Sequence, residues 1–402
     1  MTRARLLAVA AGAAVALALS FDQCFAAEPR PATNLTRRQA ARPLRDWRRQ
    51  PFSRRSPWNH PIGSGARYAT IPRLASYMAS LNYEERWTTA VVLAQGHDPL
   101  VKMVFSPNWG PYSSWAFLNR GGKTCGNGHT AERNLLRHAS EQLPTEANYY
   151  STTASSDDSR WVLPTSYRAA SEGYRSVFRL PAGACPSPDS DGMMAVFQPD
   201  GWAIDIYAGV VTSDGHVVGT MASWIDARGD GTGWWNGRRA SMLPSFAGLI
   251  RSGEIAGGRI PHALAVQVPA AMLRAQYVWP AYAFDRDAGY SGSVPMGALL
   301  AIPPQVDLDT LGLSPFGLVI ARAAQDYGVY VVDRGGQGIT FLAELGNPDI
   351  RWPSRGASDP AWWKDIETIK NALRRVTNNG PTSRGGGGVP RVPLAAHLRT
   401  SD

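Results

Sequence analysis

The feature that most constrains the fold of this chain is a series of short apolar segments separated by turn-forming residues. Glycine, proline or aspartate bounds each of them from residue 193 onward. The segments are 194–197, 202–207, 217–224, 262–268 and 296–302. Strands this closely spaced, with few helices between them, favour antiparallel pairing over alternating strand–helix units. We therefore predict a mainly β chain, an antiparallel β-sandwich or jelly-roll with a few short helices.

Four segments have the residue pattern of a helix. One runs from Thr130 to about Gln142 and places Leu135 and Leu136 inward. Apolar residues recur at spacings of four and three within 71–82. Ser314 and Pro315 are typical of a helix start, and Gly328 is typical of the residue just past a helix end. A segment from Asp359 to Val376 repeats this start and carries one apolar stripe. We predict helices over these four segments.

The first residues have the pattern of a secretory signal peptide. Arg3 and Arg5 precede a 15-residue apolar run that ends at Ser20, and cleavage is expected after Ala26. The run is too short to be interpreted as a membrane span. No later stretch approaches its length without charges, so we expect no transmembrane span in the mature chain. The predicted location is secreted or periplasmic.

Most of the net charge of +9 lies near the N-terminus, because residues 28–55 contain nine arginines and two acidic residues. Such a basic segment can contact anionic envelope polymers. It lacks the aromatic–basic interleaving that favours base stacking, so no specific nucleic-acid partner is expected. We predict a signal peptide (1–26), a disordered basic arm (27–55), a β-rich globular domain (56–378) and a disordered tail (379–402). One large domain and two joined β-layers both remain open, as does the oligomeric state.

Two of the three cysteines lie outside the signal peptide. Cys125 and Cys185 are an even pair in an oxidising compartment, which predicts one disulfide that closes a 60-residue loop. Its stabilisation is about 3–4 kcal/mol if the disulfide acts by lowering the conformational entropy of the unfolded chain. Two unpaired buried thiols are the alternative.

Residues 247–264 hold the candidate acid–base pair. Glycine interrupts this apolar stretch, and Arg251, Glu254 and His262 are among its proton-transferring or charged side chains. Glu254 on a turn and His262 at a strand start suit an acid–base site. They equally suit a hydrogen-bonded structural pair.

An exported β-rich chain with 14 tryptophans and 14 tyrosines has the side chains that sugar recognition needs. The predicted function is an exported carbohydrate-active enzyme, a hydrolase or a lyase, that cleaves an extracellular polysaccharide by acid–base chemistry. The alternative is a non-catalytic carbohydrate-binding or cell-envelope protein. The candidate catalytic residues are Glu254, His262, Asp205, Asp285 and Asp333. The candidate substrate-binding residues are Trp224, Trp279, Tyr282, Tyr327 and Arg251.

No cofactor or metal is predicted. The seven histidines include no pair at ligand spacing, and there is no Cys-x-x-Cys. No Gly-x-Ser-x-Gly sequence frames a nucleophilic serine. The expected partner is therefore a polysaccharide or a cell-envelope polymer.

Five short motifs in order give the chain a family resemblance. They are Ser56-Pro-Trp-Asn59, the segment Gly248 to Ala263, Trp279-Pro-Ala281, Pro295-Met-Gly297, and Tyr327-Gly328 followed by Asp333. Together they resemble a family of exported bacterial proteins of unassigned function, over roughly residues 59–335. The chain departs from that family at Met193 and at Tyr282-Ala283, where members often have histidine, and at Leu299 and Ala301, where arginine is expected. The resemblance implies an exported β-rich protein and leaves its activity open.

Overall fold

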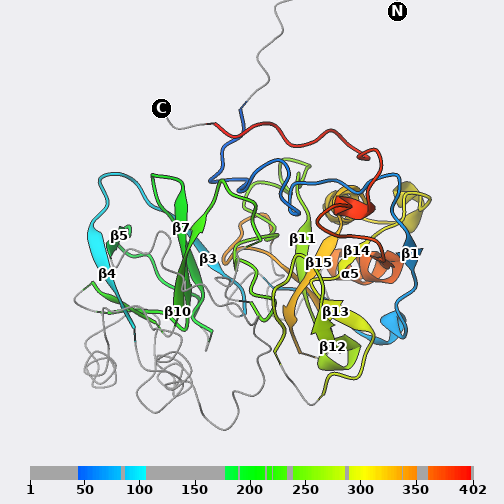
Figure 1. The fold of residues 1–402 in the computed structure, drawn as a ribbon, viewed down its shortest axis with the longest axis horizontal. Coiled ribbons are helices and arrows are strands. Elements are labelled where there is room, and N and C mark those ends of the chain that lie inside the picture. The colour runs from blue at the N-terminus through cyan, green and yellow to red at the C-terminus, as the bar shows by residue number, and fades with distance from the viewer. Residues whose placement is uncertain are drawn as a thin grey trace, which may run out of the picture. The chain divides into compact units, whose positions relative to one another are not determined.

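The structure is a computed structural model. It describes residues 44–82, 87–105, 177–188, 191–212, 215–219, 221–232, 239–285, 289–336, 338–350 and 361–399. Within these ranges the chain is mainly β, with the α-helices α4 (Pro315–Asp326) and α5 (Ala361–Ala372) and four short 3-10 turns (Figure 1). The turns are η1 (Leu74–Ser76), η3 (Ala270–Met272), η4 (Leu308–Leu311) and η5 (Arg384–Gly386). The predicted mainly β class is confirmed.

The largest sheet has seven strands and contains the two strands that position the candidate sites. In spatial order the strands are β1 (Tyr68–Ala69), β17 (Arg374–Val376), β14 (Leu299–Ala301), β15 (Val329–Arg334), β11 (Leu264–Val268), β16 (Ile339–Leu342) and β2 (Ala79–Asn82).

Three smaller sheets complete the described strands. One has the order β10 (Met221–Asp226), β7 (Trp202–Tyr207), β6 (Met194–Phe197), β3 (Ala90–Leu93). Another has the order β5 (Val177–Arg179), β4 (Leu100–Phe105), β9 (Val217–Gly219), β8 (Val210–Val211). The last pairs β12 (Leu273–Tyr277) with β13 (Val294–Met296).

All four sheets have mixed or parallel pairing, so the prediction of antiparallel sheets is wrong. Parallel neighbours are β11 and β15, β2 and β16, β3 and β6, β4 and β9, and β12 and β13. Strand pairs such as β3 with β6 come from distant parts of the chain. Close spacing along the sequence showed that the strands are short, and it did not show which of them pair.

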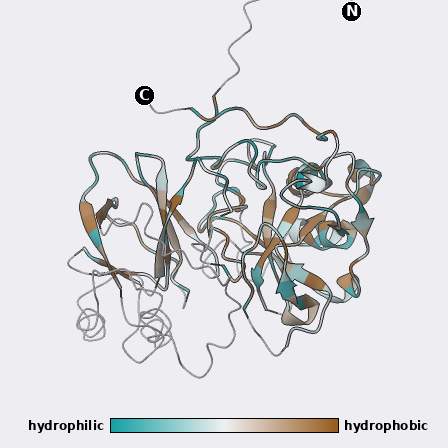
Figure 2. Ribbon diagram, viewed as in Figure 1, coloured by the Kyte–Doolittle hydropathy of each residue, from teal (hydrophilic) through white to brown (hydrophobic). Residues whose placement is uncertain are grey.

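The central strands β11 and β15 are buried on both faces of their sheet. Val329 and Val331 of β15 pack in one hydrophobic cluster with α4 and α5, and Tyr330 and Val332 pack in another with Phe197 of β6. Continuous apolar runs are expected of strands covered on both sides. Apolar colouring therefore extends along these strands (Figure 2).

Helix α4 begins and ends at the residues that the sequence marks. The Ser314 hydroxyl accepts a hydrogen bond from the Gly317 amide at 3.3 Å, and Gly328 has a φ of +85°. The helix predicted over 71–82 is wrong, because this segment forms η1 and then β2. Ala79 and Leu81 are buried there with the period of two of a strand, and β2 pairs with β16.

The basic arm and the C-terminal tail differ from the expected disorder where they are described. Trp47 and Phe52 are buried in the core, and the Arg45 amide donates to the His397 carbonyl at 2.8 Å. The Arg45 guanidinium also donates to four backbone carbonyls, those of Gln50, Pro51, Phe52 and Ala396. These bonds fix residues 44–55 and 396–399 to each other.

Consecutive glycines in the C-terminal segment allow two backbones to approach closely. The amide of Gly63 donates to the Gly385 carbonyl, and the amide of Gly65 donates to the Gly387 carbonyl, both at 2.9 Å. A Cβ atom at Gly63 would lie 2.0 Å from the Gly387 oxygen. The glycines that suggested a flexible tail are therefore required for tight packing.

Replacement of Gly63 by alanine should destabilise the domain, because the new methyl group overlaps backbone that cannot rotate away. We expect a loss of about 2–4 kcal/mol in the free energy of unfolding, measured by urea denaturation. Gly96→Ala is the matched control, since a Cβ at Gly96 meets no atom within 4 Å. An equal, small effect of both substitutions would contradict the close approach.

Candidate functional site

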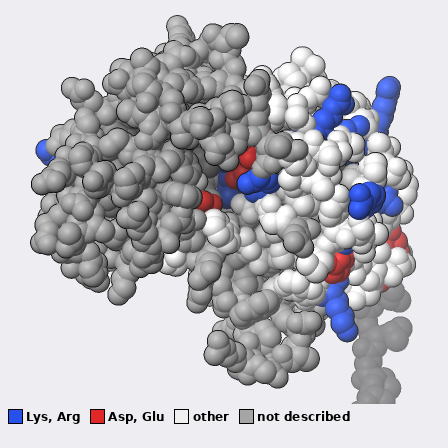
Figure 3. Space-filling model, turned by 90° about the horizontal axis from the view of Figure 1, so that it is seen from below, with Lys and Arg blue, Asp and Glu red and all other residues white. Residues whose placement is uncertain are grey.

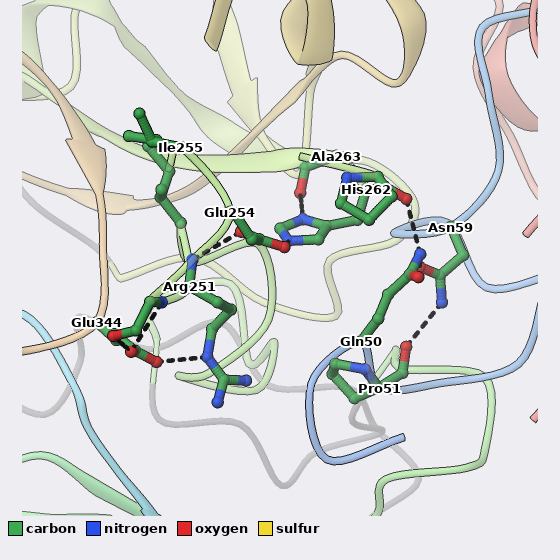
Figure 4. Close-up of polar contacts among 12 residues, drawn as sticks. Gln50, Pro51, Asn59, Arg251, Glu254, Ile255, His262, Ala263 and Glu344 are labelled. Atoms are coloured by element: carbon green, nitrogen blue, oxygen red, sulfur yellow. Dashed lines mark hydrogen bonds and ion pairs between the residues drawn. The ribbon is translucent and has the colours of Figure 1, made fainter. Parts of the chain in front are cut away.

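Glu254 and His262 form a hydrogen-bonded pair. The His262 Nε2 atom lies 3.0 Å from Glu254 Oε1, and His262 Nδ1 lies 2.9 Å from the Ala263 carbonyl oxygen (Figure 4). Because a carbonyl only accepts, Nδ1 carries a proton. The side chains are 6% and 13% exposed for His262 and Glu254. The fold therefore brings these two side chains together as a hydrogen-bonded pair.

A tight turn positions Glu254 beside the histidine. Its second carboxylate oxygen accepts the Arg251 amide at 2.7 Å, and the Gly257 amide donates to the Gly253 carbonyl. Gly253 has a φ of +85°, in the left-handed region where a side chain would be strained. The glycine-containing turn over residues 251–258 thus brings Glu254 to the start of β11.

The charge of Glu254 controls the protonation of His262. Burial alone would lower the pKa of His262, but the negative charge of Glu254 and the hydrogen bonds to Glu254 and Ala263 together raise this pKa above its usual 6.5. The pair is therefore an imidazolium–carboxylate ion pair over a wider pH range than a free histidine would allow.

Arg251 belongs to a second ion pair beside the first. Its Nε atom lies 2.5 Å from Glu344 Oε2, and its guanidinium lies 5.7 Å from the centre of the Phe197 ring. Glu344 also accepts the Ser252 amide at 2.8 Å. Arg251 is therefore held by the protein and is not presented to a substrate.

The cavity that borders His262 is small. Arg251, Gln50, Asn59 and Trp58 line it, together with Pro51, Phe52, Phe246, Gly248 and Leu249. The space suits about one water molecule, far less than a sugar ring needs. Asn59 is fully buried and bonded to Gln50 and to the Pro51 carbonyl (Figure 4). The geometry favours a structural role for Glu254 and His262.

Asp285 and Asp333 are the second group of candidate catalytic residues that the fold brings together, after Glu254 and His262. Asp333 lies near the end of β15, where the register shifts: Val266 of β11 pairs with Val331, but Gln267 pairs with Asp333. Val332 is the extra residue on β15. Such a bulge changes the direction of the side chain that follows it, and bulges are common beside active sites.

Asp285 is held by two side chains from different segments. The Tyr290 hydroxyl donates a hydrogen bond to Asp285 Oδ1, and Arg334 Nε lies 3.9 Å from Asp285 Oδ2. Asp285 is 18% exposed and Arg334 is 41% exposed. Figure 3 shows one face of the molecule, on which some acidic and basic side chains lie side by side.

The Asp333 carboxyl group has an unusual proton affinity. Burial is the main cause that raises its pKa; the positive charge of Arg239 opposes this, and the negative charges of Asp285 and Asp191 reinforce it. The resulting pKa of Asp333 is about 7. Burial and the same Asp285 carboxylate also raise the pKa of Tyr290. Near neutral pH, Asp333 can therefore both hold and release a proton.

The Glu254–His262 pair and the Asp285–Asp333 group lie at opposite ends of the β11–β15 pair. His262 precedes β11, whereas Asp333 pairs with Gln267 near its end. Five residues of extended chain span roughly 16 Å. The five candidate catalytic residues thus do not form one site, and Glu254 cannot act on the same bond as Asp333.

Other candidate residues are part of the core. Asp205 is fully buried, and its carboxylate accepts hydrogen bonds from the Ser245 amide and hydroxyl. Trp224 is 5% exposed and packs edge-on against Phe178, and Tyr327 is 2% exposed. Buried groups with protein partners do not contact a substrate, so the structure does not support these roles.

Two of the candidate substrate-binding residues, Trp279 and Tyr282, are partly exposed. The guanidinium of Arg384 lies 5.9 Å from the Trp279 ring centre, so the C-terminal segment occupies one face of this ring. The half-buried Tyr282 donates its hydroxyl hydrogen to Thr232 at 3.0 Å. Cys125 and residues 130–142 lie outside the described residues. The disulfide with Cys185 and the helix over 130–142 therefore stay predictions, as does the signal peptide.

Sequence reasoning missed Tyr290, Arg334, Arg239 and Asp191 beside the two aspartates. Tyr290 follows Asp285 by five residues in a glycine-containing loop, a weak signal that only the fold makes specific. Arg334 directly follows Asp333, and its exposure could have been inferred from the turn after β15. Nothing in the sequence relates Arg239 or Asp191 to this place.

Within the described part of the chain, no three histidine, cysteine or acidic side chains gather in a way that could hold a metal ion. No helix of that same part is long and apolar enough to cross a membrane. No protein-family model, curated protein or solved structure matches the chain. Its function has to be inferred from its own residues.

Glu254→Gln should destabilise the protein more at low pH than at high pH. The raised pKa of His262 means that the ion pair contributes fully below pH 6.5 and loses its contribution as pH rises through the folded-state pKa. We expect a loss of about 1–3 kcal/mol near pH 5.5 and a smaller loss near pH 9, measured by urea denaturation. The exposed Asp309, substituted by asparagine, is the control. A loss that grows with pH would contradict the ion pair.

Proposed function

We propose that this chain is an exported enzyme that cleaves an extracellular polysaccharide by acid–base chemistry, with Asp333 and Asp285 as its catalytic carboxyl groups. The observation that carries the proposal is the pKa of about 7 for Asp333 beside the Asp285 carboxylate. Glycoside cleavage needs one protonated and one ionised carboxyl group close together. An environment that raises the pKa of a buried carboxyl group toward neutrality is typical of acid–base sites.

In the proposed hydrolysis, Asp333 gives its proton to the glycosidic oxygen while the bond from that oxygen to the anomeric carbon breaks. A water molecule adds to this carbon and loses a proton to Asp285, which Tyr290 holds by a hydrogen bond. Arg334 and Arg239 stabilise the negative charge that remains on the carboxylates. In a lyase, the ionised carboxylate would instead remove a proton from the sugar ring.

The remaining expectations belong to the same proposal. A signal peptide over 1–26 and a Cys125–Cys185 disulfide fit an exported enzyme. A sandwich arrangement of the sheets would suit a polysaccharide cleft, and so would the aromatic content of the chain. The resemblance to exported bacterial proteins agrees with this location.

A non-catalytic carbohydrate-binding or envelope protein is the second candidate. The observation in its favour is that Glu254 and His262, the pair with the residue types best suited to proton transfer, bond to each other beside a cavity of about one water molecule. A binding protein needs no proton-transferring groups and would keep this pair for stability alone.

Asp333→Asn and Asp285→Asn should each lower kcat by about 100-fold or more, because each removes a proton-transfer step. The purified protein would be tested on neutral glucans, xylans, pectate and glycosaminoglycans, with reducing ends and unsaturated products as separate readouts. Asp309→Asn, an exposed carboxyl on η4, is the matched control and should keep wild-type turnover. Turnover that survives both substitutions would reject the site, and binding without turnover would favour the binding protein.

The pH profile provides an independent test of the roles. A catalytic acid must be protonated, so kcat/KM should fall as pH rises through about 7, the pKa of Asp333. Tyr290→Phe removes the hydroxyl that bonds Asp285 and should change the acidic side of the profile more than the alkaline side. A profile that is flat between about pH 6 and 9 would contradict the assignment of Asp333 as the acid.

A further inference from the structure

We propose that Tyr277 is a binding platform for a sugar ring of the polysaccharide that lies outside the reacting centre. This inference rests on the proposed function, because it extends the same site. Tyr277 is the last residue of β12, which Figure 1 labels. Its side chain is among the exposed large hydrophobic ones, at 39% exposure.

A row of aromatic rings connects Tyr277 to the carboxyl groups. The Tyr277 ring centre lies 6.4 Å from that of Phe284 with an interplanar angle of 40°. The Phe284 ring lies 6.4 Å from that of Tyr290 at 33°. Tyr290 donates its hydroxyl hydrogen to Asp285. The exposed end of the row is therefore two ring contacts away from the catalytic pair.

The packing gives Tyr277 the rigidity that a platform needs. Phe284 is only 6% exposed, so it supports the Tyr277 ring from the protein side. Residues 274–276 of β12 are also exposed and offer no other large apolar surface. The C–H face of a pyranose ring buries apolar area against such an aromatic surface, and its hydroxyl groups stay in water.

The other aromatic candidates are less suited to this role. Arg384 lies over the Trp279 ring, and Tyr327 is buried. Tyr282 is half-buried, and its hydroxyl is bonded to Thr232. Of the tyrosines and tryptophans considered as substrate contacts, Tyr277 alone combines large exposure with a packed connection to Asp285.

The proposed contact predicts a particular kinetic effect. Tyr277 touches a ring outside the reacting centre, so it binds the ground state and the transition state equally. Tyr277→Ala should raise KM about 10-fold with kcat nearly unchanged. Tyr277→Phe keeps the ring and should behave like the wild type. Val278→Ala is the matched control, because Val278 is the next residue and is also 39% exposed.

Binding measurements separate this inference from the proposed enzyme. Retardation in gels that contain each polysaccharide of the panel, together with thermal unfolding as a folding check, would be measured for all three variants. Loss of retardation in Tyr277→Ala alone supports the platform even if no polysaccharide is cleaved. A wild-type protein that cleaves a polysaccharide while Tyr277→Ala keeps its KM overturns the platform and leaves the enzyme intact. A wild-type protein that binds no polysaccharide overturns the platform as well.

Discussion

The parallel pairing of β11 with β15 is the interaction on which the rest of the structure depends. Leu264 pairs with Val329, and both strands are covered on two faces by separate hydrophobic clusters. Two strands buried in this way gain free energy from apolar burial on both sides, and their registers are strongly specified. Each candidate site lies at an end of this pair. The position of the functional side chains is therefore a consequence of core packing.

The two ends of the β11–β15 pair differ in how their buried charges are paired. At the beginning of β11, two carboxylates each have an opposite charge within hydrogen-bonding distance: Glu254 bonds His262, and Glu344 bonds Arg251. Near the end of β15, Asp333 has two other carboxylates near it and one arginine among the charges that shift its pKa. A paired cluster stabilises a fold, whereas an unbalanced cluster holds a proton that it can release. This contrast is the physical reason to place chemistry at Asp333.

Local features of the fold could be predicted from the sequence, and long-range ones could not. Strands β6 and β7 and helix α4 follow from apolar patterns and capping residues that lie within a few positions of each other. Glu254 and His262 could be placed together because one short turn connects them. The segment 71–82 fits both a helical and an alternating pattern. Its last four residues form strand β2 because they pair with β16. Asp285 and Asp333 were recognised as candidates, but their proximity depends on the sheet order, which no local pattern contains.

The register shift on β15 explains why this site could not be derived from alternation alone. Regular alternation would place Asp333 on the same face as Val331, within the cluster that packs on α4 and α5. An ionised carboxylate among these apolar side chains would lose its hydration, which costs several kcal/mol. Because Val332 is the extra residue, Asp333 instead lies opposite Gln267, where Arg239, Asp285 and Asp191 set its pKa. One added residue thus keeps the strand buried and still places a proton-binding group at its end.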